Sequence, residues 1–229
     1  MVNTVGSLKD NKYWQKKWVD IKAALSITQQ QHSLIVGTLL GDGTLRVGSG
    51  AINANLKIEQ GLAQQEYVWW KYRILEPFVF TGPKISYRYR ENREKYRKSL
   101  WFRTIRHQSL TAFHKRFYVN GRKIVPADIA HDLNALALAV WIMDDGSLNR
   151  KVIDISTYSF TEAEIHLLQE VLKENFGLSA NYHRDRDKGY RMYFNQSETK
   201  KVVEIIAPFV IPSLAYKVSL RDPVTTSLI

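Results

Sequence analysis

The sequence predicts an α+β protein built from two related halves. Two segments, LIVGTLLGDGTLR at residues 34–46 and ALAVWIMDDGSLNR at residues 137–150, are apolar runs that end in Asp-Gly, then Thr or Ser, then Leu. Their aspartates, Asp42 and Asp145, lie 103 residues apart in a chain of 229. Because self-similarity at a fixed spacing is typical of a repeated structural unit, we expect one apolar helix in each half.

The same order of elements is predicted after each apolar run. After the first run we expect a strand, a helix and a basic strand pair, at residues 54–59, 66–78 and 84–105. After the second run we expect a strand, a helix and further strands, at residues 152–157, 162–176 and 180–194. Thr161 with Glu164 forms a capping box for the last of these helices, and Gly177 stands where a C-cap glycine belongs.

Composition limits the classes of protein that the chain can belong to. A hydrophobic content of 45% supports a substantial core, and we expect two halves at residues 29–126 and 127–229 with an extension at residues 1–28. The formal charge of +11 favours a polyanionic partner. The absence of cysteine means that any metal is held by oxygen or imidazole. The apolar stretches are far shorter than the roughly 20 residues needed to cross a bilayer, so no membrane partner is expected.

An Asp-Gly pair after an apolar run has a simple structural explanation. The helix ends there, and glycine supplies a left-handed residue after it. This leaves the aspartate unexplained, because the helix dipole disfavours a negative charge in the last turn. Small residues also lie one turn apart in or just before the runs, Gly37 with Gly41 and Ala135 with Ala139, and this spacing lets helix backbones approach closely.

If the two apolar helices pack side by side, their C-terminal ends meet and Asp42 becomes a neighbour of Asp145. Two carboxylates this close are unfavourable unless a cation lies between them. Oxygen ligands without any thiolate indicate Mg²⁺ or Mn²⁺. The repeated motif therefore predicts a divalent metal site at the junction of the halves.

The basic charge is concentrated in one segment. Residues 84–106 hold nine Lys or Arg against two Glu, a net charge of +7. Basic residues alternate there with Ile85, Tyr87 and Tyr89, which predicts a half-buried strand with one cationic face. A two-stranded ribbon fits the major groove of DNA, although an edge strand charged against aggregation is an alternative explanation. The expected DNA contacts of this ribbon are Lys84, Arg88, Arg90, Arg93, Lys95, Arg97, Lys98 and Arg103.

Further DNA contacts are expected outside the ribbon. On the neighbouring strand of the first half they are Arg46, Asn53, Asn55 and Lys57. The weaker counterpart in the second half consists of Arg184, Arg186, Lys188 and Arg191. Unlike surfaces on the two halves imply an asymmetric DNA target.

The runs LIVGTLLGDG and LAVWIMDDG resemble the two signature motifs of the LAGLIDADG homing endonucleases, in the double-motif form that works as a monomer. The resemblance covers roughly residues 30–220. It implies an αββαββα half repeated twice, with the signature helices at a pseudo-twofold interface and a saddle of antiparallel strands set in the DNA major groove. One departure is that Val140 and Asp144 stand where the first motif has Gly37 and Gly41.

The resemblance also implies roles for individual residues. The acidic residue before the final glycine of each motif would be the metal ligand, hence Asp42 and Asp145. Lys123 and Lys217 match basic residues near the active sites of the family, and Glu59 resembles a polar position that holds water or metal. Gly41 and Asp144 are additional candidate metal-binding positions, and Asp144 lies about 100° round the helix from Asp145.

The expected function is site-specific double-strand DNA cleavage that depends on Mg²⁺, with Mn²⁺ able to substitute, and leaves short 3′ overhangs. Two alternatives stay open: an RNA maturase that acts on its own intron, and a DNA-binding protein that does not cleave. Retention of both aspartates favours the nuclease, because binding alone needs no acidic pair. We expect a soluble monomer that acts in the organelle or prokaryotic cytoplasm where its gene resides.

Overall fold

The computed structural model describes residues 19–90 and 95–220. The first repeat contains α2 (Gln29–Leu40), β1 (Thr44–Val47), β2 (Ala54–Gly61), α3 (Gln65–Leu75), β3 (Lys84–Arg90), β4 (Lys95–Arg103) and α4 (Gln108–Phe117). The second contains α5 (Ala135–Asp145), β7 (Gly146–Asn149), β8 (Val152–Ser156), α6 (Glu162–Phe176), β9 (Asn181–Arg184), β10 (Tyr190–Tyr193) and α7 (Gln196–Ile206). The small pair β5 (Tyr118–Val119) and β6 (Arg122–Lys123) lies between the repeats.

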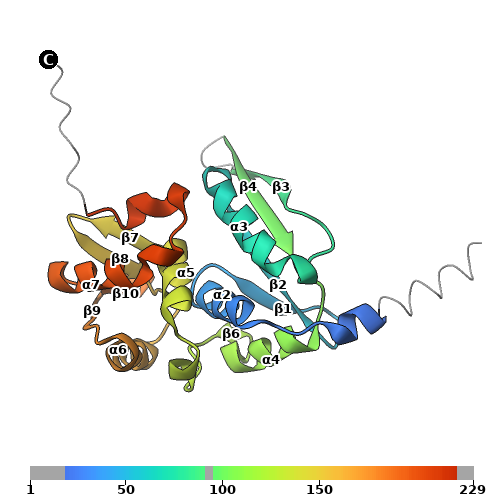
Figure 1. Ribbon diagram of the computed structural model, residues 1–229, viewed down its shortest axis with the longest axis horizontal. Coiled ribbons are helices and arrows are strands. Elements are labelled where there is room, and N and C mark those ends of the chain that lie inside the picture. Colours follow the sequence, from blue (N-terminus) through green and yellow to red (C-terminus); the bar gives the residue numbers. More distant parts are fainter. Residues whose placement is uncertain (1–18, 91–94, 221–229) are drawn as a thin grey trace, which may run out of the picture.

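Each repeat folds into one four-stranded antiparallel sheet. The strand orders are β1-β2-β4-β3 and β7-β8-β10-β9, so equivalent strands take equivalent places in the two sheets. Helices α3 and α4 cover one face of the first sheet, and α6 and α7 pack against the second (Figure 1). The predicted α+β class and the αββαββα order of each half are therefore confirmed.

Local sequence signals set several helix ends. The helix expected over residues 66–78 is α3 followed by a 3₁₀ turn, Glu76–Phe78. Helix α6 spans the predicted range, with the Thr161 capping box formed and Gly177 left-handed at φ 65°. The described residues also include short 3₁₀ helices, at Leu62–Gln64, Ile129–His131, Arg186–Lys188, Ala207–Phe209 and Pro212–Lys217.

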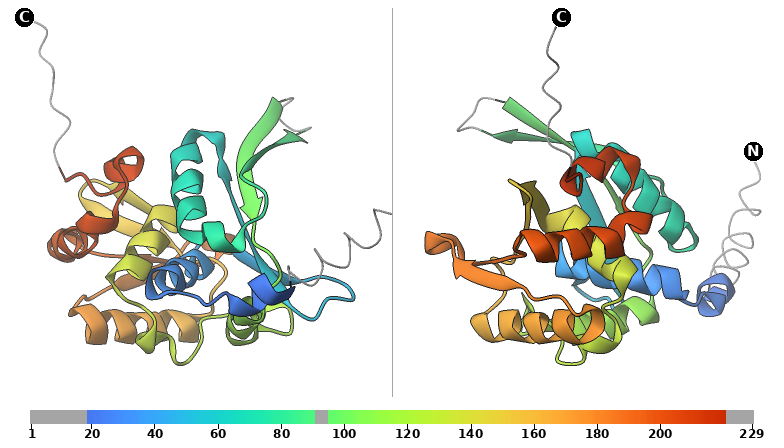
Figure 2. Two further views of the ribbon diagram at one scale, coloured as in Figure 1. Left: turned by 45° about the vertical axis from the view of Figure 1, so that its right-hand side comes forward. Right: turned by 60° about the vertical axis from the view of Figure 1, so that its left-hand side comes forward.

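The signature helices α2 and α5 lie side by side at the centre of the molecule, between the two sheets (Figures 1 and 2). A Cβ added at Gly37 would lie 2.3 Å from the Ala137 carbonyl oxygen and 2.7 Å from Cβ of Val140. A Cβ added at Gly41 would lie 2.5 Å from Cβ of Asp144. Equivalent positions of the two motifs thus meet across the interface, as a pseudo-twofold axis requires.

The close contact between the helices does not use the small residues that the sequence indicated on the second helix. The atoms nearest to the two glycines of α2 belong to Ala137, Val140 and Asp144 rather than to Ala135 or Ala139. The glycines of the first helix therefore supply the space, and the larger side chains of the second helix fill it.

The glycines that follow the two aspartates are not left-handed caps. Neither Gly43 nor Gly146 has a positive φ. A Cβ at Gly43 would lie 2.3 Å from Cγ2 of Thr38, and one at Gly146 would lie 2.5 Å from the Ile142 carbonyl oxygen. Glycine is needed here because the chain passes close to its own helix as it enters the first strand of the sheet.

The core extends through both halves and around the central helices. Every residue from Ala137 to Met143 on α5 is at most 1% exposed, since this helix packs against α2, α7 and its own sheet. Of the expected extension, residues 19–28 are described, and the Lys22 carbonyl oxygen lies 2.9 Å from Nε2 of His107. Among the described helices, none is long and apolar enough to cross a membrane.

The prediction that β3 is a half-buried strand is wrong. Ile85, Tyr87 and Tyr89 are 49%, 60% and 53% exposed. Strand β3 is the edge strand of its sheet, and the β3–β4 hairpin extends beyond the helices that cover the rest of the sheet (Figure 2). The alternation in the sequence therefore separates two solvent-facing surfaces along most of this strand.

Gly37→Ala is expected to lower the free energy of unfolding by about 2–3 kcal/mol, because the added methyl group overlaps a backbone carbonyl that cannot rotate away. Urea unfolding measures the loss. Gly61→Ala is a matched control, since an added Cβ there meets nothing within 4 Å, and it should change stability by less than about 0.5 kcal/mol. Equal losses in the two variants would contradict close packing of α2 on α5.

Candidate active site and nucleic-acid interface

The two predicted acidic residues emerge at the same end of the paired helices. Asp145 is the last residue of α5, and Asp42 directly follows Gly41, the C-cap of α2. The Nε2 of Gln60 donates to Oδ2 of Asp42 at 2.9 Å and to Oδ1 of Asp144 at 3.2 Å. Because one amide nitrogen contacts carboxylates of both motifs, the acidic groups of the two halves meet at this junction.

The carboxylates at the junction repel one another. Burial, followed by the negative charges of Asp42 and Asp144, raises the pKa of Asp145 from 3.8 to about 7, although Lys123 and Lys217 act in the opposite direction. Hard oxygen donors that repel each other fit a divalent cation such as Mg²⁺. Within the described ranges, no set of three or more His, Asp or Glu side chains is arranged to hold a metal ion.

Asp144 forms a buried ion pair that the sequence did not indicate. Nζ of Lys71, on α3, lies 2.7 Å from Oδ1 and 2.9 Å from Oδ2 of Asp144, and the two side chains are 1% and 0% exposed. Burial raises the pKa of Asp144, and the charge of Lys71 opposes this rise. The Asp144 carboxylate is therefore already paired with a cation of the protein.

The two predicted lysines lie against the ends of the signature helices. Nζ of Lys123 donates to the carbonyl oxygens of Gly41 at 2.6 Å and Gly43 at 3.1 Å. Nζ of Lys217 donates to the carbonyl oxygen of Met143 at 2.6 Å. Burial lowers the pKa of both lysines. Carbonyls at a helix C-terminus carry partial negative charge, so each ammonium group compensates one helix end beside the acidic cluster.

The first sheet presents one strongly cationic surface. Residues that pair across antiparallel strands point to the same face, and the face opposite the covering helices carries Thr44, Arg46, Asn55, Lys57, Glu59, Lys84, Arg88, Arg97, Ser99, Trp101 and Arg103. We call this surface the basic face. Lys98 pairs with Tyr87 on the opposite face. Arg93 lies outside the described residues, and Arg90 and Lys95 are described only by their backbone pairing.

The Glu59 carboxylate is paired with two basic side chains and a serine. Its carboxylate accepts from Nζ of Lys57 at 2.5 Å, Oγ of Ser99 at 2.6 Å and Nη2 of Arg88 at 3.1 Å. Although burial acts to raise it, hydrogen bonds from Lys57 and Ser99 hold the pKa of Glu59 below its usual value. Glu59 and Asp42 line the same cavity of about 450 Å³, so the acidic junction opens onto the basic face.

The two asparagines predicted to contact DNA are held within the protein. Asn53 accepts a hydrogen bond at 3.0 Å from Oγ1 of Thr111, on α4. Asn55 is only 8% exposed. Arg46 is exposed beside them, so the basic side chain rather than the amides is available at this end of the basic face.

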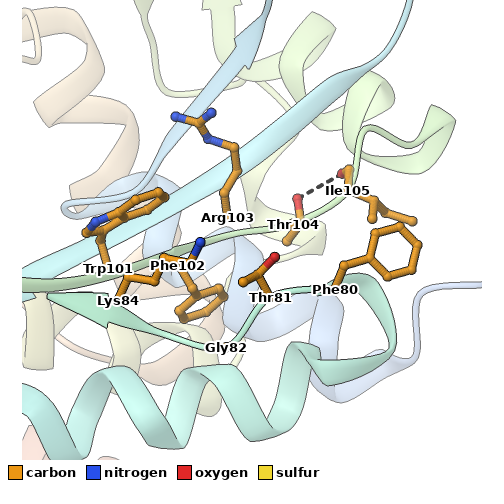
Figure 3. A pocket seen from close by; sticks show the side chains of 9 residues that line it. All are labelled: Phe80, Thr81, Gly82, Lys84, Trp101, Phe102, Arg103, Thr104 and Ile105. Atoms are coloured by element: carbon orange, nitrogen blue, oxygen red, sulfur yellow. Dashed lines mark hydrogen bonds between the residues drawn. The ribbon is translucent and has the colours of Figure 1, made fainter.

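A second cavity, of about 250 Å³, opens at the edge of the basic face where β3 begins and β4 ends (Figure 3). It is lined by Phe80, Thr81, Gly82, Lys84, Trp101, Phe102, Arg103, Thr104 and Ile105. The ring of Trp101 lies under two cations, 5.5 Å from Nζ of Lys57 and 5.8 Å from the Arg103 guanidinium carbon. These contacts hold long basic side chains over an aromatic surface, as cation–π attraction favours.

The corresponding face of the second sheet has much less free charge. Arg191 forms an ion pair with Asp154, and its Nη1 donates to the hydroxyl of Tyr158 at 3.0 Å. Asp154 also accepts from Oγ of Ser147 at 3.1 Å. Of the four cations predicted to contact DNA in this half, Arg191 is therefore largely neutralised by the protein itself.

The other three predicted cations of the second half lie elsewhere. Arg184 pairs with Tyr190, the neighbour of Arg191 on β10. Because successive residues of a strand point to opposite faces, Arg184 lies on the opposite face of the sheet from Arg191. Arg186 and Lys188 lie in the 3₁₀ turn between β9 and β10, and Nζ of Lys188 is 3.7 Å from Asp185. Arg184 and Arg191 therefore do not lie on one surface, and the DNA contacts predicted for the second half stay a prediction.

Lys71 and Gln60 were not among the residues predicted for the site. Lys71 is spaced at helical intervals from Tyr67, Val68 and Leu75, which are all buried, so the sequence places a lysine on an apolar helix face. A cation at such a position indicates a buried acidic partner, and this signal could have identified Lys71. Gln60 carries no comparable signal.

The chain belongs to the LAGLIDADG DNA endonuclease family, whose model matches residues 32–202. This range includes both signature motifs, at residues 34–46 and 137–150, and both four-stranded sheets. The family assignment thus agrees with the duplicated motif, the paired helices and the two sheets.

Individual relatives extend over most of the chain. DNA endonuclease I-ChuI of Chlamydomonas applanata is 31% identical over an alignment of 211 positions, which covers 85% of this chain and 97% of that protein. Cytochrome b mRNA maturase bI2 of Debaryomyces hansenii is 29% identical over an alignment of 195 positions, which covers 83% of this chain and 74% of that protein. The homing endonuclease I-WcaI, solved bound to its DNA recognition sequence, has the same fold, with a TM-score of 0.82, 19% identity and 96% of both chains covered.

Asp145→Asn is expected to stabilise the metal-free protein at pH 8. The folded-state pKa of Asp145, about 7, lies above its ordinary value of 3.8, so only the folded state keeps the proton between these values. Stability is therefore lost as the pH rises through this window. Asparagine removes the loss, which amounts to up to about 4 kcal/mol for a difference of about three pH units. Urea unfolding in EDTA measures it.

The same comparison at pH 5 is the control. Most of the loss has not yet occurred at that pH, so the gain from the Asp145→Asn variant should fall to less than half of its value at pH 8. A gain that is equal at both pH values, or absent at pH 8, would contradict the raised pKa of Asp145.

Proposed function

We propose that this protein is a site-specific endonuclease that cuts both strands of DNA and uses Asp42 and Asp145 as its metal-ligating residues. The observation that carries the proposal is the meeting of acidic groups from two equivalent motifs at one junction, beside a cavity that opens onto the basic face. A carboxylate from each half provides one centre for each DNA strand.

The proposed cofactor is Mg²⁺, with Mn²⁺ able to substitute. Repulsion between carboxylates and the lack of any thiolate favour such a hard cation. When bound, the metal would polarise the phosphate and lower the pKa of a water molecule. Asp42 and Asp145 are preferred over the other candidates, because Asp144 is paired with Lys71 and the Gly41 carbonyl accepts a hydrogen bond from Lys123.

The two lysines would act on the charge of the reacting phosphate. Lys123 and Lys217 are anchored to helix-end carbonyls beside the acidic cluster, so their ammonium groups are held in place before the substrate arrives. A positioned cation at such a site offsets the negative charge that develops during phosphodiester hydrolysis. Glu59 would have a different role, orienting Lys57 and Arg88 on the basic face.

We propose a long, asymmetric DNA target that is cut to leave short 3′ overhangs. The first sheet would supply most of the electrostatic attraction through its basic face, whereas Arg191 on the second sheet is paired with Asp154. One chain carries both acidic centres and both sheets, so a monomer is the proposed active unit. We further propose that it acts on DNA in the compartment that holds its own gene, an organelle or a prokaryotic cytoplasm.

An intron RNA maturase is the second candidate function, because one relative is a cytochrome b mRNA maturase. A DNA-binding protein that does not cleave is a third candidate on the same fold. The acidic pair distinguishes them: a maturase or a pure DNA-binding protein would keep its activity without both aspartates, whereas the nuclease requires them.

Asp42→Asn and Asp145→Asn are each expected to abolish double-strand cleavage while DNA binding survives, since each removes one charged ligand and preserves side-chain shape. Purified protein with Mg²⁺ is first incubated with a randomised duplex library, and the cut sequences are recovered. Cleavage of a plasmid carrying the recovered target then compares the variants, and an electrophoretic shift without Mg²⁺ measures binding. Glu204→Gln, at an exposed position of α7, is the control. Unaltered cleavage by both aspartate variants would refute the mechanism.

Lys84→Gln is expected to reduce the slope of log Kd against log salt concentration by about 1, because one phosphate contact is lost. Lys84 lies on the basic face and is exposed. Lys200, which is exposed on α7, provides the matched control Lys200→Gln. Fluorescence anisotropy with the recovered target over a range of KCl concentrations measures both slopes, and identical slopes would argue against the basic face as the DNA surface.

A further inference from the structure

One buried ion pair crosses from the first half of the molecule to the second. Lys71 projects from α3 of the first repeat, and Asp144 belongs to α5 of the second repeat. Nζ of Lys71 also lies 4.4 Å from the ring centroid of Tyr67, whose hydroxyl donates to the Val140 carbonyl at 3.2 Å. These contacts fix the lysine in one position, since its ammonium group is enclosed by the carboxylate and the aromatic ring.

This ion pair has no counterpart related by the pseudo-twofold axis. The position equivalent to Asp144 in the first motif is Gly41, and an added Cβ there would lie 2.5 Å from Cβ of Asp144. The first motif therefore makes room for a side chain that only the second motif carries. A buried ion pair is weak evidence for a stability function, because apolar residues of similar size often stabilise a protein equally well.

Gln60 connects this ion pair to one of the two catalytic aspartates. Its amide nitrogen lies between Oδ1 of Asp144 at 3.2 Å and Oδ2 of Asp42 at 2.9 Å, and the side chain is 8% exposed. Asp144, held by Lys71, thereby fixes the direction of the Gln60 amide, and that amide holds one oxygen of Asp42.

The second aspartate lacks such a connection. The pairs Thr44↔Lys57 and Ser147↔Asp154 are equivalent in the two sheets. Three residues after Lys57 is Gln60, and three residues after Asp154 is Thr157, so Thr157 takes the position of Gln60 in the second half. The Thr157 hydroxyl donates to the backbone carbonyl of Tyr190 at 2.7 Å. Within the described part of the chain, no side chain is hydrogen-bonded to the Asp145 carboxylate.

We propose that Lys71, Asp144 and Gln60 form a positioning relay that ties the orientation of Asp42 to Asp144 of the opposite half, so that the two cleavage centres are not equivalent. The inference rests on the proposed nuclease function and deepens it. Preorganised side chains lower the barrier of the step that they serve. The strand served by Asp42 is therefore cut before the strand served by Asp145, and loss of the relay slows the first cut alone.

The test uses the full chain and a supercoiled plasmid that carries the recovered target, with each strand read separately by primer extension. The nicks left by Asp42→Asn and Asp145→Asn assign each strand to its centre. Gln60→Leu should slow the strand assigned to Asp42 about 10-fold or more and leave the other strand within about twofold. In this variant, nicked plasmid should accumulate with the break in the strand assigned to Asp145.

Two further variants separate positioning from stability. Thr157→Val changes the equivalent position of the second half and should leave the ratio of the two strand rates unchanged. Removing either partner alone would leave an unpaired buried charge, so Lys71→Met is combined with Asp144→Met. The double variant should fold, as urea unfolding would show, and should lose the same strand as the Gln60→Leu variant.

A binding measurement provides a readout that does not depend on cleavage. Calorimetric titration of Ca²⁺ into the metal-free protein–DNA complex should show that the Gln60→Leu variant loses affinity at one of two sites, whereas the Thr157→Val variant keeps both. Equal slowing of both strands by Gln60→Leu, or no slowing at all, would overturn the relay and leave the nuclease intact. Failure of the unmodified chain to cut would overturn the proposed function and the relay with it.

Discussion

The contact between α2 and α5 is the constraint on which the rest of the molecule depends. Gly37 and Gly41 bring the two backbones together until a single added methyl group would overlap the facing helix. This approach aligns the C-terminal ends of both helices, and each of those ends enters the first strand of its own sheet. The acidic junction and the placement of the two sheets thus follow from one packing interaction, because a helix pair held further apart would separate both.

The same contact concentrates negative charge at one place, and three lysines compensate part of it. Three acidic side chains and two helix C-termini gather at one place, and all five carry negative charge or a negative partial charge. Lys123 and Lys217 neutralise the helix ends, and Lys71 neutralises Asp144. Burial and then the charges of Asp42 and Asp144 still raise the pKa of Asp145 to about 7. This unfavourable ionisation of a buried carboxyl group is the physical reason that we propose a divalent cation at the junction.

The duplication is symmetric in its backbone and asymmetric in its chemistry. Both sheets have the same strand order, yet the cations of the first form a continuous basic face, and Arg191 of the second is paired with Asp154. At the interface, Gly41 faces Asp144 and Gln60 takes the place of Thr157. A repeated fold can therefore bind an unsymmetrical ligand, because strand pairing depends little on the side chains that project from the sheet.

The sequence by itself determined the duplicated α+β order, the ends of α6, the acidic pair and the concentration of basic charge, since periodicity, capping residues and repeats are local patterns. Only the tertiary structure decided the partners of the buried side chains. The contacts of Lys71 and Gln60 with Asp144 join residues 73 and 84 positions apart, and no local pattern encodes such contacts. The exposure of Tyr87 and the pairing of Arg191 were also fixed by packing, because a strand's alternation separates two faces without saying what covers either one.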